Sequence, residues 1–421
     1  MKQLSALSRF LILLPGGMFL VETSSADVTA AQITVTGTTN ATTVATVLRQ
    51  TAGPTLTVAT SPPNLGDLSL LLAGNPLPQA QGVIIPSANQ FRYGAVGERN
   101  MIEVPGELTD TIPGGFPAGM WLSTTGVAGT GAEANFNLAM VHFPFADGWT
   151  AGHVQGTTGS LLAGNGAGVT ITPQFDATFG NGHYKFSIAG VDSRSAGMLF
   201  AVGGKNDTSA NVVPVGVLPD GTGWDVRIND QGVNFPATEQ ANWSFVYVPY
   251  HATNLLAAGR VSLFPTDNST APPTAVDQVS AVGNWTASMV DIGNSTTNAA
   301  IIPPGSDGLL DAGRVLITIP GKNDTTGHFM AGVSKYASTT VSGADDNFLT
   351  WEYNSALGGF LVESYDLTGA NLQNSDFYFA YFDYSAPIAI PEPGVLTLTM
   401  CGGLGLLLRR RRRVPQALTE R

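Results

Sequence analysis

An internal repeat is the feature of this sequence that most restricts its fold. Two apolar runs, residues 198–202 and 315–319, each lead into the same pentapeptide, Gly-Lys-Asn-Asp-Thr. An apolar run that stops at glycine and asparagine is typical of a β-strand followed by a turn. The copies are roughly 105 to 135 residues apart, which suits a β-sandwich module better than a solenoid coil of ~20–45 residues.

Each copy ends in a strand rich in large apolar residues. The two clear examples are residues 243–250 and 377–384, and a fainter one is residues 135–145. A tryptophan lies upstream of each of them: Trp121, Trp224 and Trp351. Apolar side chains on both faces predict a central strand that is buried between two layers. The sequence therefore predicts two clear modules and one degenerate module.

Composition favours an all-β fold. Hydrophobic residues make up 43% of the chain and charged residues only 12%, with 50 Gly and 26 Pro. Helical proteins use more Glu, Lys, Arg and Leu, and no long stretch with 3.6-residue periodicity occurs in the middle of the chain. We therefore expect all-β, tandem β-sandwich-like modules, flanked by an N-terminal signal helix and a C-terminal transmembrane helix.

The repeats and the composition together divide the chain into seven segments. At 421 residues, the chain is longer than one hydrophobic core usually serves. The predicted segments are a signal peptide (1–26), a Thr/Ala-rich β segment (27–82), a degenerate β module (83–157), a β module (158–264), a Pro/Thr/Asn-rich connection (265–305), a second clear β module (306–385) and a C-terminal tail (386–421).

The N-terminal residues have the pattern of a secretory signal peptide. Lys2 and Arg9 precede an apolar run over residues 10–21, which Pro-Gly-Gly interrupts. Small residues at Ser24-Ser25-Ala26 then predict cleavage between Ala26 and Asp27. The alternative is a retained membrane anchor, but the run is far shorter than the ~20 residues that a spanning helix needs.

The C-terminal tail has three parts in a fixed order. Pro391-Glu392-Pro393 comes first, an apolar segment over residues 394–408 follows, and Arg409, Arg410, Arg411, Arg412 and Arg413 come last. This order resembles the PEP-CTERM sorting signal of Gram-negative bacteria. Arginines resist translocation and hold the tail on the cytoplasmic side, which leaves the tripeptide at the outer face of the inner membrane. A plain tail-anchored protein is the alternative.

The resemblance to PEP-CTERM proteins implies partners and a location. An exosortase would read the Pro-Glu-Pro motif and remove the tail, after signal peptidase has cut the other end. The chain would be anchored in the inner membrane transiently and then reach the cell surface or extracellular matrix. Proteins of this family are associated with exopolysaccharide and biofilm matrix, so polysaccharide is a candidate partner. The resemblance covers only the sorting tail.

Charge and cysteine content exclude other partners and sites. Residues 27–390 keep 11 of the 19 Lys and Arg and 28 of the 31 Asp and Glu, which gives them a net charge of −17. Such a surface would repel phosphate backbones, so nucleic acid is not expected as a partner. The single cysteine, Cys401, lies in the apolar tail, so residues 27–390 contain neither disulfides nor cysteine-based metal sites.

No catalytic motif is present, and we assign no catalytic residue, metal or cofactor. The sequence has no Gly-x-Ser-x-Gly elbow, His-Glu-x-x-His helix or phosphate-binding loop. His153 and His183 each follow a glycine and are expected at turns or on the surface. Turn aspartates that could bind calcium are Asp207, Asp324, Asp345 and Asp346. Turn formation explains these aspartates equally well.

Two kinds of function follow from these observations. The first is an exported, non-enzymatic protein with a structural or adhesive role. The alternative is an extracellular carbohydrate-binding module or a glycan-active hydrolase, which would need exposed rings or a pair of carboxylates. Rings that could stack on a sugar or pack in the core are Trp224, Trp243, Tyr247, Tyr250, Trp351 and Tyr353. Their recurrence at related positions of the repeat favours the core.

Overall fold

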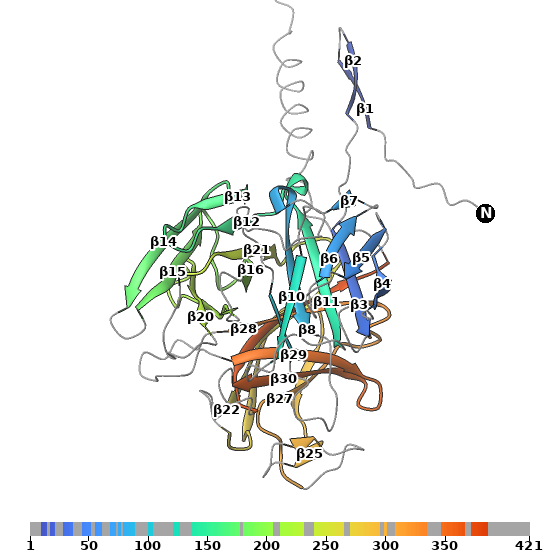
Figure 1. Ribbon diagram of the computed structural model, residues 1–421, viewed down its shortest axis with the longest axis vertical. Helices are drawn as coiled ribbons and strands as arrows, with labels where there is room; N and C mark the ends of the chain where they lie inside the picture. The colour runs from blue at the N-terminus through green and yellow to red at the C-terminus, as the bar shows by residue number, and fades with distance from the viewer. Residues whose placement is uncertain are drawn as a thin grey trace, which may run out of the picture.

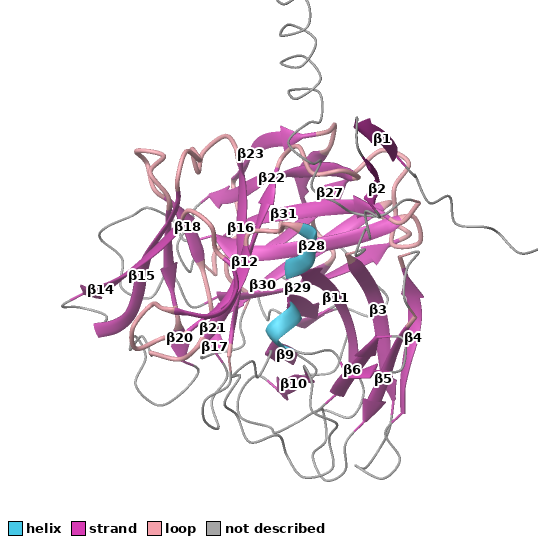
Figure 2. Cartoon of the chain, turned by 90° about the horizontal axis from the view of Figure 1, so that it is seen from above, coloured by secondary structure: helices cyan, strands magenta, loops and turns pink. Residues whose placement is uncertain are grey.

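A computed structural model describes the greater part of the residues between 28 and 385. The described ranges are 10–14, 17–21, 28–36, 44–51, 55–60, 68–72, 75–76, 79–88, 100–103, 121–126, 136–176, 180–204, 211–230, 240–264, 270–294, 299–300, 308–334, 347–366 and 372–385. These residues form several separate sheets and two single turns of 3-10 helix, η1 (Gln79–Gln81) and η2 (Phe145–Asp147) (Figure 2). The all-β prediction is confirmed.

The first unit is built from strands β3 to β11. One sheet has the order β4-β3-β11-β8, and the other has the order β5-β6-β10-β9 with β7 paired to β6. The strands are β3 (Thr29–Thr36), β4 (Val44–Gln50), β5 (Leu56–Thr60), β6 (Leu68–Leu72), β7 (Asn75–Pro76), β8 (Gly82–Ala88), β9 (Asn100–Glu103), β10 (Trp121–Gly126) and β11 (Phe136–Pro144).

The second unit is built from strands β12 to β21. Its sheets have the orders β13-β12-β21-β16 and β14-β15-β19-β18, and β17 pairs with β20. The strands are β12 (Ala151–Val154), β13 (Leu161–Asn165), β14 (Val169–Asp176), β15 (Gly180–Ile188), β16 (Gly197–Gly203), β17 (Asn211–Val212), β18 (Val215–Val217), β19 (Trp224–Arg227), β20 (Asn229–Asp230) and β21 (Trp243–Pro249).

The third unit is built from strands β22 to β31. Its sheets have the orders β23-β22-β31-β28 and β24-β27-β30-β29, and β25 pairs with β26. The strands are β22 (Leu255–Phe264), β23 (Ala275–Val282), β24 (Thr286–Met289), β25 (Gly293–Asn294), β26 (Ala299–Ala300), β27 (Arg314–Thr318), β28 (Gly327–Ser334), β29 (Asn347–Asn354), β30 (Gly359–Asp366) and β31 (Asp376–Asp383).

The three units have one topology. Among the described residues, each unit has eight strands longer than two residues, which we number one to eight in chain order. In every unit, the strand order is 2-1-8-5 in one sheet and 3-4-7-6 in the other. The eighth strand, called the closing strand below, is β11, β21 or β31. It lies inside its sheet between the first and fifth strands, and every residue of β21 is buried. A strand in that position must be apolar on both faces, as the closing strands are.

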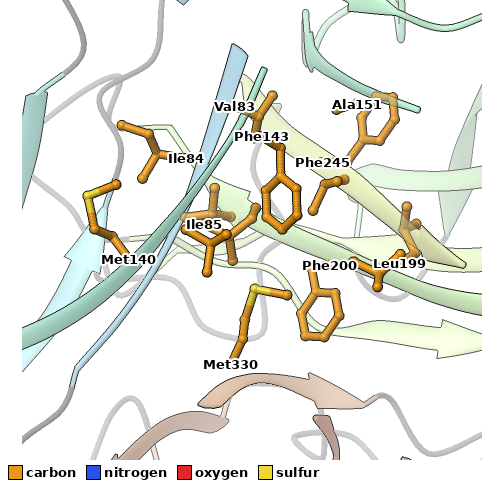
Figure 3. Packing of buried hydrophobic residues seen from close by; sticks show 14 of the residues in the cluster. Val83, Ile84, Ile85, Met140, Phe143, Ala151, Leu199, Phe200, Phe245 and Met330 are labelled. Atoms are coloured by element: carbon orange, nitrogen blue, oxygen red, sulfur yellow. The ribbon is translucent and has the colours of Figure 1, made fainter. Parts of the chain in front are cut away.

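The fifth strands bring the three units together at the centre of the molecule. β8 contacts both β16 and β28, Phe200 of β16 packs against Tyr378 of the third unit, and Figure 1 shows the three units set around these strands. Ile85, Phe200 and Met330 hold the same position on these three strands, the fourth residue of each, and all three are buried. Figure 3 shows them facing one common space. One hydrophobic cluster therefore includes residues of all three units.

One unit boundary is closed by strand pairing. β29 of the third unit runs parallel to β8 of the first and bonds to it through Thr350 and Ala88. The two four-stranded sheets thereby become one sheet of eight strands. The indole Nε1 of Trp351 donates a hydrogen bond to Ser87 Oγ across the same boundary, at 2.9 Å.

Strand pairing places the unit boundaries elsewhere than the sequence predicted. Residues 27–82 are not a separate segment, because β3 and β4 lie in the sheet that β11 closes. Residues 265–305 are not merely a connection, because β23 and β24 belong to the third unit. β22, which was placed in the second unit, pairs with β31 of the third. These partners are distant in sequence, so local composition does not reveal them.

The structure describes part of one of the two predicted terminal helices, and that part is not helical. Within the expected signal helix, β1 (Phe10–Leu14) and β2 (Gly17–Val21) pair as an antiparallel hairpin. Proline and glycine interrupt the apolar run there, and each half is too short to stabilise a helix alone. The C-terminal segment 394–408 lies outside the described residues, as do the cleavage residues Ala26 and Asp27 and the sorting residues 391–393 and 409–413. Among the residues that are described, no helix has the length and apolar character to cross a bilayer.

Candidate functional site

A cavity of about 500 Å³ lies between the second and third units. Its size is within the range of ~300–1,000 Å³ that is usual for small-molecule sites. The second unit contributes Ser193, Arg194, Ser195, Gly197, Met198, Leu199, Val215, Val217, Trp224 and Tyr250, and the third contributes Arg260, Val279, Ser280, Ala281, Ser334 and Tyr378.

The cavity lies at a boundary that strand pairing does not close. In the third unit, the sixth strand β29 pairs with β8 of the first unit. In the second unit, the sixth strand β18 contacts β28 of the third unit but pairs only with β19. β18 has three residues, whereas β29 has eight. β18 pairs with no strand of the third unit among the described residues, and the cavity lies at this unpaired boundary.

The wall from the second unit is apolar and well packed. Met198, Leu199, Val215 and Trp224 are all at most 5% exposed. The Trp224 ring is held edge-on by Phe186 and Tyr247, with ring centroids at 5.9 and 5.6 Å. A wall of this kind offers van der Waals contact rather than hydrogen bonds.

Two buried hydroxyl groups in the cavity lining lack a partner. Ser193 Oγ and the Tyr378 hydroxyl make no hydrogen bond within the described structure, and their residues are 1% and 6% exposed. The Tyr378 ring itself is fixed edge-on against Phe200, at 4.9 Å between centroids. A buried hydroxyl without a partner costs about 1–3 kcal/mol, but neighbouring atoms seal both oxygens from the cavity itself.

A third hydroxyl belongs to Tyr250, which is half-buried. Burial raises the pKa of Tyr250 to about 12, and the nearby Arg260 opposes that shift. Burial also raises the pKa of Tyr378 far above its ordinary value. Both phenols are therefore neutral at physiological pH and can donate hydrogen bonds.

Of the two arginines in the cavity lining, Arg194 is paired with a carboxylate and Arg260 is not paired with any carboxylate of the described residues. Arg194 bonds to both carboxylate oxygens of Asp192, with Nε to Oδ1 at 3.0 Å and Nη2 to Oδ2 at 2.8 Å. These hydrogen bonds lower the pKa of Asp192 to about 2, so the pair stays ionised and neutral overall. Arg260 is exposed and forms no ion pair with any carboxylate of the described residues. Its charge is available to a ligand.

The histidines do not lie where the sequence predicted. His153 is 1% exposed, on β12, with Nδ1 2.7 Å from Ser244 Oγ and Nε2 3.0 Å from the Gly82 carbonyl oxygen. The prediction of a turn or surface position was therefore wrong, because the glycine before it lies within β12 rather than at a turn. His142 is also buried, and neither of its ring nitrogens has a partner in the described structure. Burial and the neighbouring His153 lower the pKa of His142 to about 4.

His183 and the acidic residues are occupied by structural contacts. His183 lies on β15 and pairs with Asp225 of β19. Asp311 and Glu363 converge on Arg314, at 3.1 and 2.6 Å, and all three are at most 3% exposed. Two carboxylates that are buried around one guanidinium cannot act on a glycosidic bond.

The structure gives the predicted calcium ligands no support as a site. Asp324 accepts a hydrogen bond from Arg49 at 2.7 Å, and the Asn323 side chain accepts bonds from the backbone of Thr325 and Thr326, which is turn chemistry. Asp207, Asp345 and Asp346 lie outside the described residues. In the described part of the chain, no three His, Cys, Asp or Glu side chains are grouped as a metal site would need.

The recurring aromatic rings are core residues. Trp224, Trp243 and Trp351 are at most 1% exposed and Tyr247 is 7% exposed, so they have no free face for a sugar ring.

The sequence contained one indication of the cavity that the sequence analysis did not identify. Arg260 occupies an exposed position in the middle of a ten-residue strand that is otherwise almost entirely buried and apolar.

Comparisons with protein-family models, with curated proteins and with solved structures find no match to this chain.

Proposed function

We propose that the chain is an exported, exosortase-sorted protein of the cell surface or extracellular matrix, with a structural or adhesive role. The observation that carries this proposal is the order of the tail: Pro391-Glu392-Pro393, the apolar segment 394–408 and the arginines of 409–413. A short apolar segment with four glycines is a weak permanent anchor, which suits a tail that is removed. Signal peptidase and exosortase would act in turn during export.

The form of the body supports a display role. Three sandwich units of one topology share a central core, so that the body is held together without any disulfide. We infer that the units are tandem copies of one β-sandwich module, and that polysaccharide of the matrix is a candidate partner.

The alternative of a glycan-active hydrolase or a carbohydrate-binding module has less support. The carboxylates that converge at Arg314 are buried and neutralised, and the recurring tryptophans are in the core. A sugar-binding function would need other residues than those that the sequence suggested.

The sorting signal can be tested in the cells that produce the protein. Replacing Glu392 with Ala should leave the exported chain uncut, because the proposed recognition tripeptide loses its only charge. Intact-mass analysis of the cell-surface and membrane fractions should show a trimmed chain for the natural sequence and an untrimmed, membrane-bound chain for the variant. Pro415→Ala, which lies beyond the arginines, serves as the matched control. Identical trimming of all three chains would contradict the proposal.

A further inference from the structure

We infer that the cavity between the second and third units binds a small amphipathic organic anion, whose apolar body contacts Met198, Leu199 and Val215 and whose carboxylate lies at Arg260. The inference is independent of the surface role proposed above. It rests on the volume and lining of the cavity and on one cation that no carboxylate of the described residues neutralises.

The lining decides the class of the ligand body. The inner wall is made of aliphatic side chains and the Trp224 ring, which is packed edge-on and buried. A saccharide carries a hydroxyl on almost every carbon, and each would need a partner that this wall does not offer. An acyl chain or a similar apolar body meets no such penalty, and burying it is favourable by about 25 cal/mol per Å².

The polar groups decide the head of the ligand. Ser193 Oγ and the Tyr378 hydroxyl are buried in the lining and have no partner in the described structure. Both oxygens are sealed from the cavity, so the head of the ligand meets the exposed guanidinium of Arg260 instead, and a carboxylate, which accepts several hydrogen bonds and donates none, suits that group. Arg260 adds a positive charge that no described carboxylate neutralises. A neutral head would leave the charge of this guanidinium uncompensated.

The net charge of −17 over residues 27–390 bears on how Arg260 distinguishes an anionic ligand from a neutral one. An anion is repelled by the surface as a whole, so general electrostatic attraction does not explain its binding. Burial of the apolar body acts equally on an anion and on its neutral analogue, so the contact with the guanidinium is what favours the anion over the analogue. Removing this one charge should therefore weaken an anion and leave a neutral analogue of the same length unaffected.

The test is calorimetric titration of the full chain with decanoate and, as its neutral analogue, decanol. The natural chain should bind decanoate saturably at one site and more tightly than decanol. Arg260→Gln should weaken decanoate about tenfold or more and leave decanol unchanged, since a hydrogen bond to a charged group contributes about 1.5–3 kcal/mol. Lys185→Gln, which removes one positive charge on β15 outside the cavity lining, should change neither.

Two further variants locate the bound molecule. Ala281→Trp places a large ring in the lining at an exposed position, where the fold tolerates it, and should abolish the binding of both ligands. Tyr378→Phe keeps the ring that packs on Phe200 and removes only a hydroxyl that is sealed from the cavity, so it should change neither affinity. The thermal midpoint of each variant verifies that it is folded. Absence of saturable binding by the natural chain, or equal affinity of the natural chain and Arg260→Gln for decanoate, would overturn the inference.

Discussion

At the scale of single residues, the three units share a cross-strand contact between a glycine and a ring. Each glycine is the first residue of the fifth strand and pairs with the last residue of the closing strand. A Cβ on any of them would come closer than 3.0 Å to a ring on the closing strand, two residues before its end. The three pairs are Gly82 with His142, Gly197 with Tyr247 and Gly327 with Tyr381. The rings can cross the strand only because the glycines lack side chains.

The ring of the first unit is a histidine, and this makes stability depend on pH. The pKa of His142 falls from 6.5 to about 4 in the folded chain. The unfolded chain therefore binds one more proton between those values, so the free energy of unfolding decreases as the pH falls from about 6.5 to about 4. Burial lowers the pKa of His328 to about 3, which extends the same loss to lower pH.

We predict that His142→Gln reduces this acid sensitivity. The natural chain should lose on the order of 3 kcal/mol through His142 between pH 7 and pH 4, and the variant should lack that part of the loss. Urea unfolding at pH 7 and pH 4.5 measures it. The exposed His251, changed to Gln, is the matched control and should keep the full dependence. An unchanged pH dependence in His142→Gln would show that this histidine is not buried in its neutral form.

At the scale of elements, the sequence predicted the closing strands and misaligned the turns. Residues 135–145, 243–250 and 377–384 do fall on β11, β21 and β31, because a strand inside its sheet must be apolar on both faces and that pattern is visible locally. Gly-Lys-Asn-Asp-Thr, however, follows the fifth strand of the second unit but the fourth strand of the third. The pentapeptide encodes a turn and not a place in the topology.

The candidate site shows a similar limit. The position of Arg260 within an apolar stretch is visible in the sequence, but the cavity lies at a unit boundary across which β18 does not pair as β29 does. Pairing across that boundary depends on residues far apart in the chain, and local periodicity contains no information about it. The burial of His153 was missed for the same reason, since its partners Gly82 and Ser244 are 71 and 91 residues away.

The joint between β29 and β8 yields a prediction at this scale. The Trp351 ring is fully buried, and its Nε1 donates to Ser87 Oγ of the first unit. Ser87→Ala should leave that N–H buried without an acceptor and cost about 1–3 kcal/mol. Urea unfolding followed by tryptophan fluorescence measures the change. Ser288→Ala, at an exposed position on β24, should alter stability little, and an equal effect of the two variants would contradict a role of this bond in joining the units.

At the scale of the whole molecule, the three units share a hydrophobic core and are not independently packed domains. The hydrophobic cluster that fills the first and second units also contains Met330, Tyr378 and Phe382 of the third. The rest of the third unit has a second cluster around Trp285 and Phe360. Since Ile85, Phe200 and Met330 meet at the centre (Figure 3), each unit buries its fifth strand against the other two. We therefore expect the three units to unfold as one cooperative body.

Met330→Ala tests this expectation. Shortening a fully buried methionine leaves a cavity and costs about 2–5 kcal/mol. Because Met330 contacts the shared cluster, hydrogen exchange measured by mass spectrometry should accelerate in β8 and β16 as well as in β28. Met289→Ala removes the same atoms from β24, where the side chain packs against the second cluster, all of whose buried residues but Ala139 belong to the third unit. Acceleration confined to the third unit in both variants would mean that the central contact does not couple the units, and that each sandwich is stable by itself.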